Sequence, residues 1–271
     1  MTEQHLNRRA RRLLAPMLAM GTISAGALAV TATPAHAAVG SGYGCAYKSN
    51  ISLFGGPFGT QGCGTQTSTY ATPNSAAPDR SWVYGSPGSA TDSDGAMAKY
   101  GPAVFLSSPY DINDTLTNTG QLKVSTSGTT NVNVSARATG LGPSPFWTST
   151  PTSHPNPSSP AGYAEGRCIA YPNGTKAGSS TISKGYVDTK LDADGYPLPG
   201  YTVAVPTAPA PNTRINFTID NISPEEHGHM VFNEQILNPD GSITVTAAHM
   251  YAEGPIAVGD VAIGQVTCRN M

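Results

Sequence analysis

The sequence predicts an all-β protein with a single antiparallel, β-sandwich-like domain and two disulfides. Short runs of alternating apolar and polar residues recur along the chain, and Gly, Pro, Asn and Asp separate them. Almost no segment has the 3.6-residue apolar period of an amphipathic helix. Charged residues make up only 12% of the chain, whereas Gly and Pro number 30 and 23. This composition is typical of short strands joined by turns.

The first 37 residues have the order of a secretory signal peptide. Four arginines between residues 8 and 12 precede an uncharged apolar run over 13–30, and Ala35-His36-Ala37 matches an A-x-A cleavage site. We predict cleavage after Ala37, by either the general or the twin-arginine export route. The alternative is an uncleaved membrane anchor, because the run approaches the roughly 20 residues that span a bilayer. Pro16 and the glycines within the run favour removal.

Residues 38–271 are expected to form the domain, and they are mildly acidic. The whole chain has 15 basic and 17 acidic residues, and the leader removes four arginines and Glu3, so 11 and 16 remain and the net charge is −5. No basic run is left, which argues against nucleic acid and anionic membranes as partners. We find no second apolar run of spanning length and no C-terminal anchor motif. We therefore expect a secreted, extracellular protein without a membrane span, and retention at the cell wall stays open.

All four cysteines lie in the predicted domain: Cys45, Cys63, Cys168 and Cys268. An even number of cysteines in an exported protein predicts disulfides, and three pairings can be drawn. We favour Cys45–Cys63, which closes a local Gly-rich loop, and Cys168–Cys268, which ties a mid-chain strand to the last strand. A four-cysteine zinc site would need CxxC-like spacing, which the sequence lacks.

The strands follow from the alternating runs. The clearest hairpin surrounds Ser127-Gly128: Leu122 and Val124 alternate before the turn, and apolar residues over 132–138 alternate after it. A second hairpin is expected around Asp194-Gly195. The other predicted elements are strands over 50–56, 80–85 and 214–223, two strands around Asp94-Gly95, a strand before the Asn173-Gly174 turn, a hairpin around 238–241, and a last strand ending at Cys268.

Residues 141–162 are rich in Pro, Ser and Thr and predict a surface loop, since proline is incompatible with a helix interior or a central strand.

Two DxDG strings resemble the start of a calcium loop, at residues 92–95 and 192–195. A calcium loop supplies six or more oxygen ligands, including a distal Glu. Neither string has these further ligands. Asp-Gly between alternating strands is sufficiently explained by a hairpin turn.

The segment EEHGH, residues 225–229, contributes to a candidate metal site. His227 and His229 share one face if the segment is a strand, and pairing about the NPDG turn at 238–241 brings His249 across from them. Three such side chains would suit zinc. We favour the competing interpretation of a polar strand entrance, because His249 alternates with apolar residues of its own strand.

Nothing else in the sequence forms a catalytic constellation. There is no G-x-S-x-G elbow, and the cysteines are assigned to disulfides. Glu165, Glu234 and Glu253 could serve in a glycosidase, but their spacing does not pair them. Six aromatic residues could stack on sugars or fill the core: Tyr43, Tyr47, Tyr70, Trp82, Tyr84 and Trp147. We predict no catalytic residues and no cofactor.

Three segments carry a family resemblance: SNISLFGGP, DSDGAMAKYGPAVF and VFNEQILNPDGSITVTAAHMYAEGPIAVGDVAIGQVTC. They are similar to the choice-of-anchor P family of secreted proteins from high-GC Gram-positive, actinobacterial bacteria. The resemblance covers most of residues 38–271, and its final segment is the most specific. It implies an exported β-rich domain of unknown activity and offers no catalytic residues. EEHGH lies outside the matching segments.

The function expected from these observations is that of a non-enzymatic extracellular or cell-envelope module, structural or binding. Its partner would be an envelope polymer or a surface protein. The alternative is a secreted carbohydrate-active or metal-dependent hydrolase.

Overall fold

The structure is a computed structural model of the 271-residue chain. It describes residues 40–53, 56–63, 65–66, 79–83, 88–92, 97–99, 115–127, 131–142, 145–148, 162–192, 197–220, 225–255 and 257–270. All of these residues belong to one unit, His36–Met271. The predicted leader, both Asp-Gly turns at 94–95 and 194–195, and most of the Pro-rich loop lie outside the described residues. Cleavage after Ala37 therefore stays a prediction.

Every element among the described residues is a β-strand, which confirms the predicted all-β class. The strands are β1 (Ser41–Leu53), β2 (Gly56–Gly62), β3 (Thr65–Gln66), β4 (Asp79–Val83), β5 (Gly88–Asp92), β6 (Met97–Lys99), β7 (Thr115–Asn118), β8 (Leu122–Ser127), β9 (Val132–Thr139), β10 (Phe146–Thr148), β11 (Tyr163–Ala170), β12 (Lys176–Ser183), β13 (Gly185–Asp188), β14 (Lys190–Leu191), β15 (Thr202–Ala204), β16 (Thr213–Ile219), β17 (Glu226–Leu237), β18 (Ile243–Gly254) and β19 (Ala257–Arg269).

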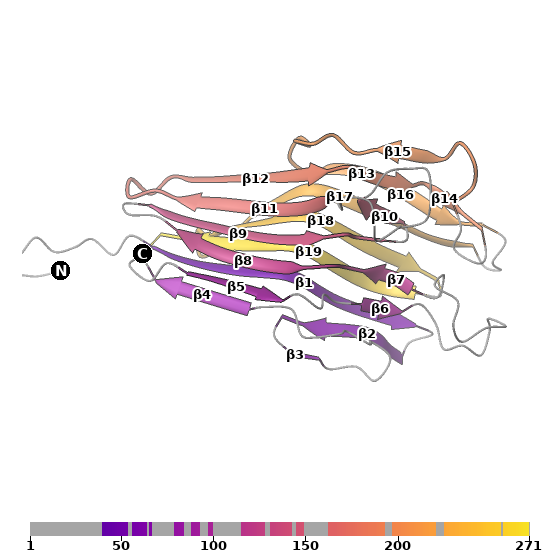
Figure 1. The fold of residues 1–271 in the computed structure, drawn as a ribbon, viewed down its shortest axis with the longest axis horizontal. Helices are drawn as coiled ribbons and strands as arrows, with labels where there is room; N and C mark the ends of the chain where they lie inside the picture. The colour runs from indigo at the N-terminus through magenta and orange to yellow at the C-terminus, as the bar shows by residue number, and fades with distance from the viewer. Residues whose placement is uncertain are drawn as a thin grey trace, which may run out of the picture. The chain divides into compact units, whose positions relative to one another are not determined.

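Two main sheets pack against each other (Figure 1). The nine-stranded sheet has the order β14-β16-β17-β18-β19-β1-β2-β3, with β4 also paired to β1, and the five-stranded sheet has the order β12-β11-β9-β8-β5. Strands β10-β13-β15 form a smaller sheet, and β6 pairs with β7. Val134 and Ala136 of the five-stranded sheet share one buried cluster with Val245 and Val266 of the nine-stranded sheet. The core therefore lies between two sheets, as in a sandwich.

Three predicted hairpins are confirmed. Strands β8 and β9 pair with Leu122 opposite Ala138, and β13 and β15 pair antiparallel on either side of Asp194-Gly195, with Asp188 opposite Thr202. Strand β14, between β13 and β15 in the chain, runs parallel with β16. Strands β11 and β12 pair around the predicted Asn173-Gly174 turn. Strands β17 and β18 pair around residues 238–241, where the Gly241 N–H donates to the Asn238 carbonyl. Along β9, buried positions alternate with half-buried ones, as a sheet with one buried face requires.

Two other sequence-based predictions need correction. Strands β5 and β6, expected to be partners around Asp94-Gly95, pair instead with β8 and β7. The Pro-rich region 141–162 contains the short strand β10, which lies at the edge of its sheet, where proline-rich segments are tolerated.

Strand β1 begins well before the predicted strand at 50–56, because Gly42 and Gly44 hide its alternation. Both glycines face the five-stranded sheet, and a Cβ on Gly44 would lie 3.3 Å from Cβ of Val124. The two sheets come so close here that only glycine fits. Glycine lowers the strand signal in a sequence, although here it is what lets the sheets approach.

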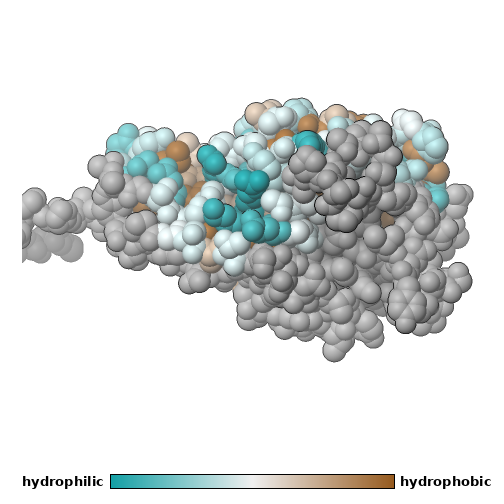
Figure 2. Space-filling view, in the orientation of Figure 1, coloured by the Kyte–Doolittle hydropathy of each residue, from teal (hydrophilic) through white to brown (hydrophobic). Residues whose placement is uncertain are grey.

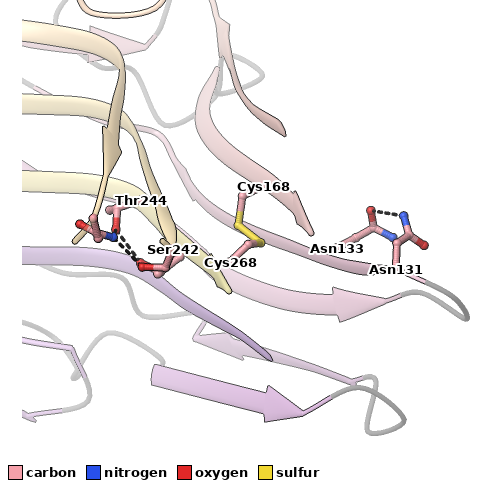
Figure 3. Close-up of a disulfide and its surroundings, with 8 residues drawn as sticks. Asn131, Asn133, Cys168, Ser242, Thr244 and Cys268 are labelled. Carbon is pink, nitrogen blue, oxygen red and sulfur yellow. Dashed lines mark hydrogen bonds between the residues drawn. A yellow bond between two sulfur atoms is a disulfide. The ribbon is translucent and has the colours of Figure 1, made fainter. Parts of the chain in front are cut away.

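Both favoured disulfides are confirmed. Cys45 and Cys63 are bonded with Cα atoms 5.8 Å apart, and Cys168 and Cys268 with Cα atoms 5.9 Å apart. The second bond joins β11 of the five-stranded sheet to β19 of the nine-stranded sheet (Figure 3). It therefore links the two layers near the end of the chain.

At one level of the nine-stranded sheet, the inward-facing positions of four adjacent strands shift by one residue. Two consecutive residues are buried there on each strand: Ala46 and Tyr47 on β1, Ile263 and Gly264 on β19, Ala247 and Ala248 on β18, and Phe232 and Asn233 on β17. The four shifts lie in one row across the sheet, because Tyr47 stands opposite Ile263, Ile263 opposite Ala248, and Ala248 opposite Phe232. Asn233 and Gly264 have positive φ angles of 50° and 64°. We call this row the transverse shift.

The transverse shift decides which side chains share the outer face, the face turned away from the five-stranded sheet. Beyond it, Gln235 points inward, because its Nε2 donates to the Gly178 carbonyl of β12 at 3.1 Å. Glu234 therefore points outward, on the same face as Val231 three residues earlier. Strict period-two alternation would have placed Glu234 and Val231 on opposite faces.

Candidate functional site

The outer face of the nine-stranded sheet carries a connected group of titratable side chains, which we call the outer-face cluster. Its centre is Glu234 on β17, His249 and Tyr251 on β18, and Asp260 on β19, and its flank is Arg214 on β16, His229 on β17 and Glu253 on β18.

His249 is held between two carboxylates from the neighbouring strands. Its Nδ1 lies 2.6 Å from Glu234 Oε2, and its Nε2 lies 3.0 Å from Asp260 Oδ2. The ring is 8% exposed. When the ring carries both protons, each nitrogen donates to a carboxylate, and charge-assisted bonds of this kind are stronger than neutral ones. The imidazolium then connects β17, β18 and β19 side by side.

Tyr251 completes the centre of the cluster. Its hydroxyl donates to Glu234 Oε1 at 2.6 Å and lies 2.9 Å from His249 Nδ1. Its ring contacts both histidines: the ring centroids are 4.2 Å apart to His249 and 4.7 Å apart to His229, the latter pair being stacked at 18°. Both oxygens of Glu234 are thus engaged, and one tyrosine ring separates the two histidines.

The flank of the cluster is more open. Glu253 Oε1 lies 3.1 Å from His229 Nδ1, and Glu253 Oε2 lies 3.8 Å from an Arg214 nitrogen. The Glu253 side chain is 40% exposed. His229 Nδ1 is buried and has no hydrogen-bond partner among the described residues, so its approach to Glu253 lacks hydrogen-bond geometry. Ion pairs as exposed as that of Glu253 and Arg214 contribute little to stability.

Charges in the centre of the cluster reinforce one another. Burial alone would raise the pKa of Glu234, but the hydrogen bonds from His249 and Tyr251 outweigh it and lower that pKa. Burial would lower the pKa of His249, but the hydrogen bonds to Asp260 and Glu234 outweigh it and raise that pKa. The pKa of Tyr251 is raised, first by burial and then by its bond to Glu234. The arrangement therefore favours a carboxylate, an imidazolium and a neutral phenol.

Register explains most of this assembly, and the transverse shift explains the rest. Tyr251 stands opposite both His229 and Asp260, which puts these three on the outer face together. His249 stands opposite Val231, so the carboxylate that reaches it from β17 is Glu234, carried outward by the transverse shift. Sequence reasoning named Glu234 only as an unpaired carboxylate and missed Tyr251 and Asp260. The alternation of His249 with Tyr251 was the available signal, but only the pairing of β18 with β19 adds Asp260.

The candidate metal site is not formed by its three histidines. Within the part of the chain that the structure describes, no three His, Cys, Asp or Glu side chains are placed to hold a metal ion. His227 is exposed and stands opposite Gly254, next to a register shift between His227 and Gly228. His229 and His249 lie on either side of the Tyr251 ring. The prediction that His249 lies on the apolar face of its strand was wrong, because the transverse shift turns its side chain outward. Its ring nitrogens contact the carboxylates of Glu234 and Asp260.

The three glutamates considered for glycoside hydrolysis are spread over the molecule. Glu165 lies on β11 of the five-stranded sheet, beside Arg167, whereas Glu234 and Glu253 lie on the nine-stranded sheet. Glu234 bonds His249, and Glu253 contacts His229 on the flank. The described carboxylates therefore do not reproduce the pair across a cleft that such a reaction uses.

The aromatic residues considered for sugar stacking differ in burial and in their contacts. Tyr47 is fully buried in the core. Trp147 stacks on Tyr186 with ring centroids 4.7 Å apart, and its indole N–H donates to Asp188 Oδ2 at 2.8 Å. Burial raises the pKa of Asp188, against the lowering effect of bonds from Thr202 and Trp147. Tyr43 is half-buried on β1. The side chains of Tyr70, Trp82 and Tyr84 lie outside the described residues.

Comparison with protein-family models, with curated proteins and with solved structures found no match to this chain. The resemblance to the choice-of-anchor P family therefore stays a prediction. None of the described residues belongs to a helix long and apolar enough to cross a membrane.

Proposed function

We propose that the protein acts outside the cell as a non-enzymatic structural or binding module of the cell envelope. The observation that carries this proposal is the saturation of His249, whose two ring nitrogens both face carboxylates. A general base must present a free lone pair to the proton it removes. An imidazolium held between Glu234 and Asp260 has none, and its role is to join three strands.

The geometry also counts against the alternative of a hydrolase. In glycosidases a substrate and a water molecule fit between two carboxyl groups about 5–10 Å apart. Here the imidazole of His249 fills the space between Glu234 and Asp260, and Tyr251 covers the second oxygen of Glu234. The cross-linked sandwich, with a disulfide joining its layers, suits a rigid module that presents surfaces.

Export and binding are tested together on the protein expressed with its leader and recovered from the medium with its disulfides intact. N-terminal sequencing is expected to start at Ala38. The recovered protein is expected to co-sediment with purified cell-wall sacculi and to release no soluble reducing sugar from them. Sugar release that the Glu234→Gln variant abolishes, while its thermal unfolding stays cooperative, would replace the proposal by the hydrolase.

A further inference from the structure

The outer face of the five-stranded sheet carries a group of cations, which we call the basic patch: Lys123 on β8, Arg137 on β9 and Arg167 on β11. Figure 2 shows hydrophilic residues gathered over these strands. The three residues are not contiguous in the sequence and form no basic run. The fold alone brings them together.

Strand register sets the spacing of the basic patch. Lys123 stands opposite Arg137, which stands opposite Glu165, and Arg167 is the next outward residue after Glu165 on β11. Neighbouring strands lie about 4.8 Å apart, and outward residues on one strand about 6.8 Å apart. The three cations are therefore rooted within roughly 12 Å of one another. Four hydroxyl residues border them in the same register: Ser125, Ser135, Ser179 and Thr181.

The basic patch has more positive charge than its own carboxylate neutralises. Glu165 is paired with Arg167. Among the described residues, no carboxylate forms an ion pair with Lys123 or Arg137, whereas Lys190, Arg214 and Arg269 each have one. Among the described residues, the basic patch thus keeps two positive charges without an ion pair, in a region, residues 38–271, whose net charge is −5.

Arg137 is held in a defined orientation. Its guanidinium lies over the Tyr163 ring, 3.7 Å from the ring centroid. Stacking on an aromatic ring fixes the plane of the guanidinium and leaves the N–H groups at its edge free to bind two oxygens at once. Its Nε is buried without a hydrogen-bond partner. An oxyanion at the patch would meet a preset donor rather than a mobile one.

We propose that the basic patch binds an anionic polysaccharide of the envelope, one that carries phosphate or carboxylate groups along an extended chain. The proposal rests on the proposed function and names its ligand class. Arginine forks match both oxyanions, and the bordering hydroxyls can bond sugar hydroxyls. The patch spans three strands of an open sheet, so it fits a chain laid across the strands. A nucleic acid fits less well, because Arg137 covers the Tyr163 ring that a base would need for stacking.

Each contact in such a complex is exposed to water and weak by itself, so affinity comes from several anionic groups of one polymer binding in turn. Binding must then fall steeply with salt. Releasing counterions from two contacts predicts a loss of about tenfold between 50 and 200 mM salt.

The test measures binding of the exported protein to immobilised polygalacturonate and poly(glycerol phosphate), with neutral dextran and single-stranded DNA as further arms. The Lys123→Gln/Arg137→Gln variant is expected to bind both polyanions about tenfold more weakly. The Lys190→Gln/Arg269→Gln variant removes the same charge from paired sites elsewhere and should lose less than about twofold. Arg137→Lys keeps the charge without the fork, and an intermediate loss is expected. Thermal unfolding verifies that each variant is folded.

Preference for one polyanion identifies the group, phosphate or carboxylate, and supports the proposal either way. Equal losses in the two double variants would show a general charge effect and overturn it. Tighter binding to single-stranded DNA than to both polyanions would also overturn it. If the protein binds neither polyanion but still co-sediments with sacculi stripped of anionic polymer, the ligand proposed for the basic patch is rejected and the proposed function stands. If it binds neither the polyanions nor the sacculi, the ligand proposal and the proposed function are both rejected.

Discussion

The two outer faces of the sandwich treat charge in opposite ways. In the outer-face cluster, His249 is buried between two carboxylates, so that both of its ring nitrogens and both oxygens of Glu234 have partners. In the basic patch, Lys123 and Arg137 stand without a carboxylate among the described residues. Paired charges on neighbouring strands link those strands, whereas exposed unpaired cations are hydrated and remain open to an anionic partner. The pairing on one face is structural, and recognition at the other is our proposal.

The largest predicted effect concerns the bond that joins the two layers behind these faces. Replacing both Cys168 and Cys268 by Ala opens a loop with a sequence separation of 100 residues. On the chain-entropy model this lowers the free energy of unfolding by about 4.7 kcal/mol. Urea denaturation of the exported proteins measures the loss.

The matched control is the Cys45→Ala/Cys63→Ala variant, whose separation is 18 residues. It should lose only about 3 kcal/mol, because the shorter loop constrains the unfolded chain less. A larger loss for this local disulfide would contradict the view that the link between layers is the main tie.

The second prediction tests the matched face. Glu234→Ala leaves the buried His249 ring with one of its two carboxylates missing, and breaking a buried pair in this way should cost about 3 kcal/mol. Glu253→Ala on the exposed flank should cost less than about 0.5 kcal/mol. Similar losses for both would mean that the centre of the cluster is no better matched than an ordinary surface pair.

Local parts of the fold could be predicted from sequence because their information is local. The hairpins β8–β9, β13–β15 and β17–β18 follow from alternation on either side of a turn. Both disulfides follow from the expected export, an even number of cysteines and the loops that they close. The hidden start of β1 could not be seen, because Gly42 and Gly44 are chosen by the approach of the other sheet and carry no strand signal.

Neither charged face could be read from the chain in advance. Period-two alternation assigns Glu234 to the wrong face, since the shift depends on the positive φ of Asn233 and on matching shifts in three neighbouring strands. Asp260 joins the cluster only through the pairing of β19 with β18. Lys123 and Arg137 become neighbours through the β8–β9 hairpin, and Arg167 joins them only when β11 pairs with β9. Clusters built across strands depend on the exact register and on the transverse shift, which alternation alone does not fix.

The third prediction is the pH dependence that the matched face confers. The pKa of Glu234 is lowered from an ordinary value of 4.5, so its contribution is complete above that value and is lost as pH falls through the lowered pKa. The pKa of His249 is raised from 6.5, so its contribution is complete below 6.5 and is lost as pH rises through the raised pKa. Stability from this pair is therefore greatest between about pH 4.5 and 6.5.

Melting temperatures measured from pH 3 to pH 10 follow both limbs of this dependence. The His249→Asn variant should lose the alkaline limb above pH 6.5, because His249 is removed and the other raised pKa in the centre, that of Tyr251, is raised from 10.0. Arg137→Gln, on the other face, should leave the shape of the profile unchanged. A wild-type profile that rises steadily from pH 6 to pH 9 would contradict the charged pairing of His249.

Substitutions in the basic patch have the smallest predicted effect on stability. This small effect is what most clearly distinguishes the basic patch from the outer-face cluster. Lys123→Gln removes an exposed charge that has no described partner and should change the free energy of unfolding by less than about 0.5 kcal/mol. Arg137→Gln also removes the contact with the Tyr163 ring, 3.7 Å away, and should cost about 0.5–1 kcal/mol. Neither value approaches that of Glu234→Ala, although all three changes remove one charge from the outer face of a sheet. Removing one cation also relieves its repulsion with the other, but this gain is smaller than the values above because water screens both charges. A loss above about 2 kcal/mol for Lys123→Gln would show that the fold depends on this charge, and the contrast between a structural face and a recognition face would fail.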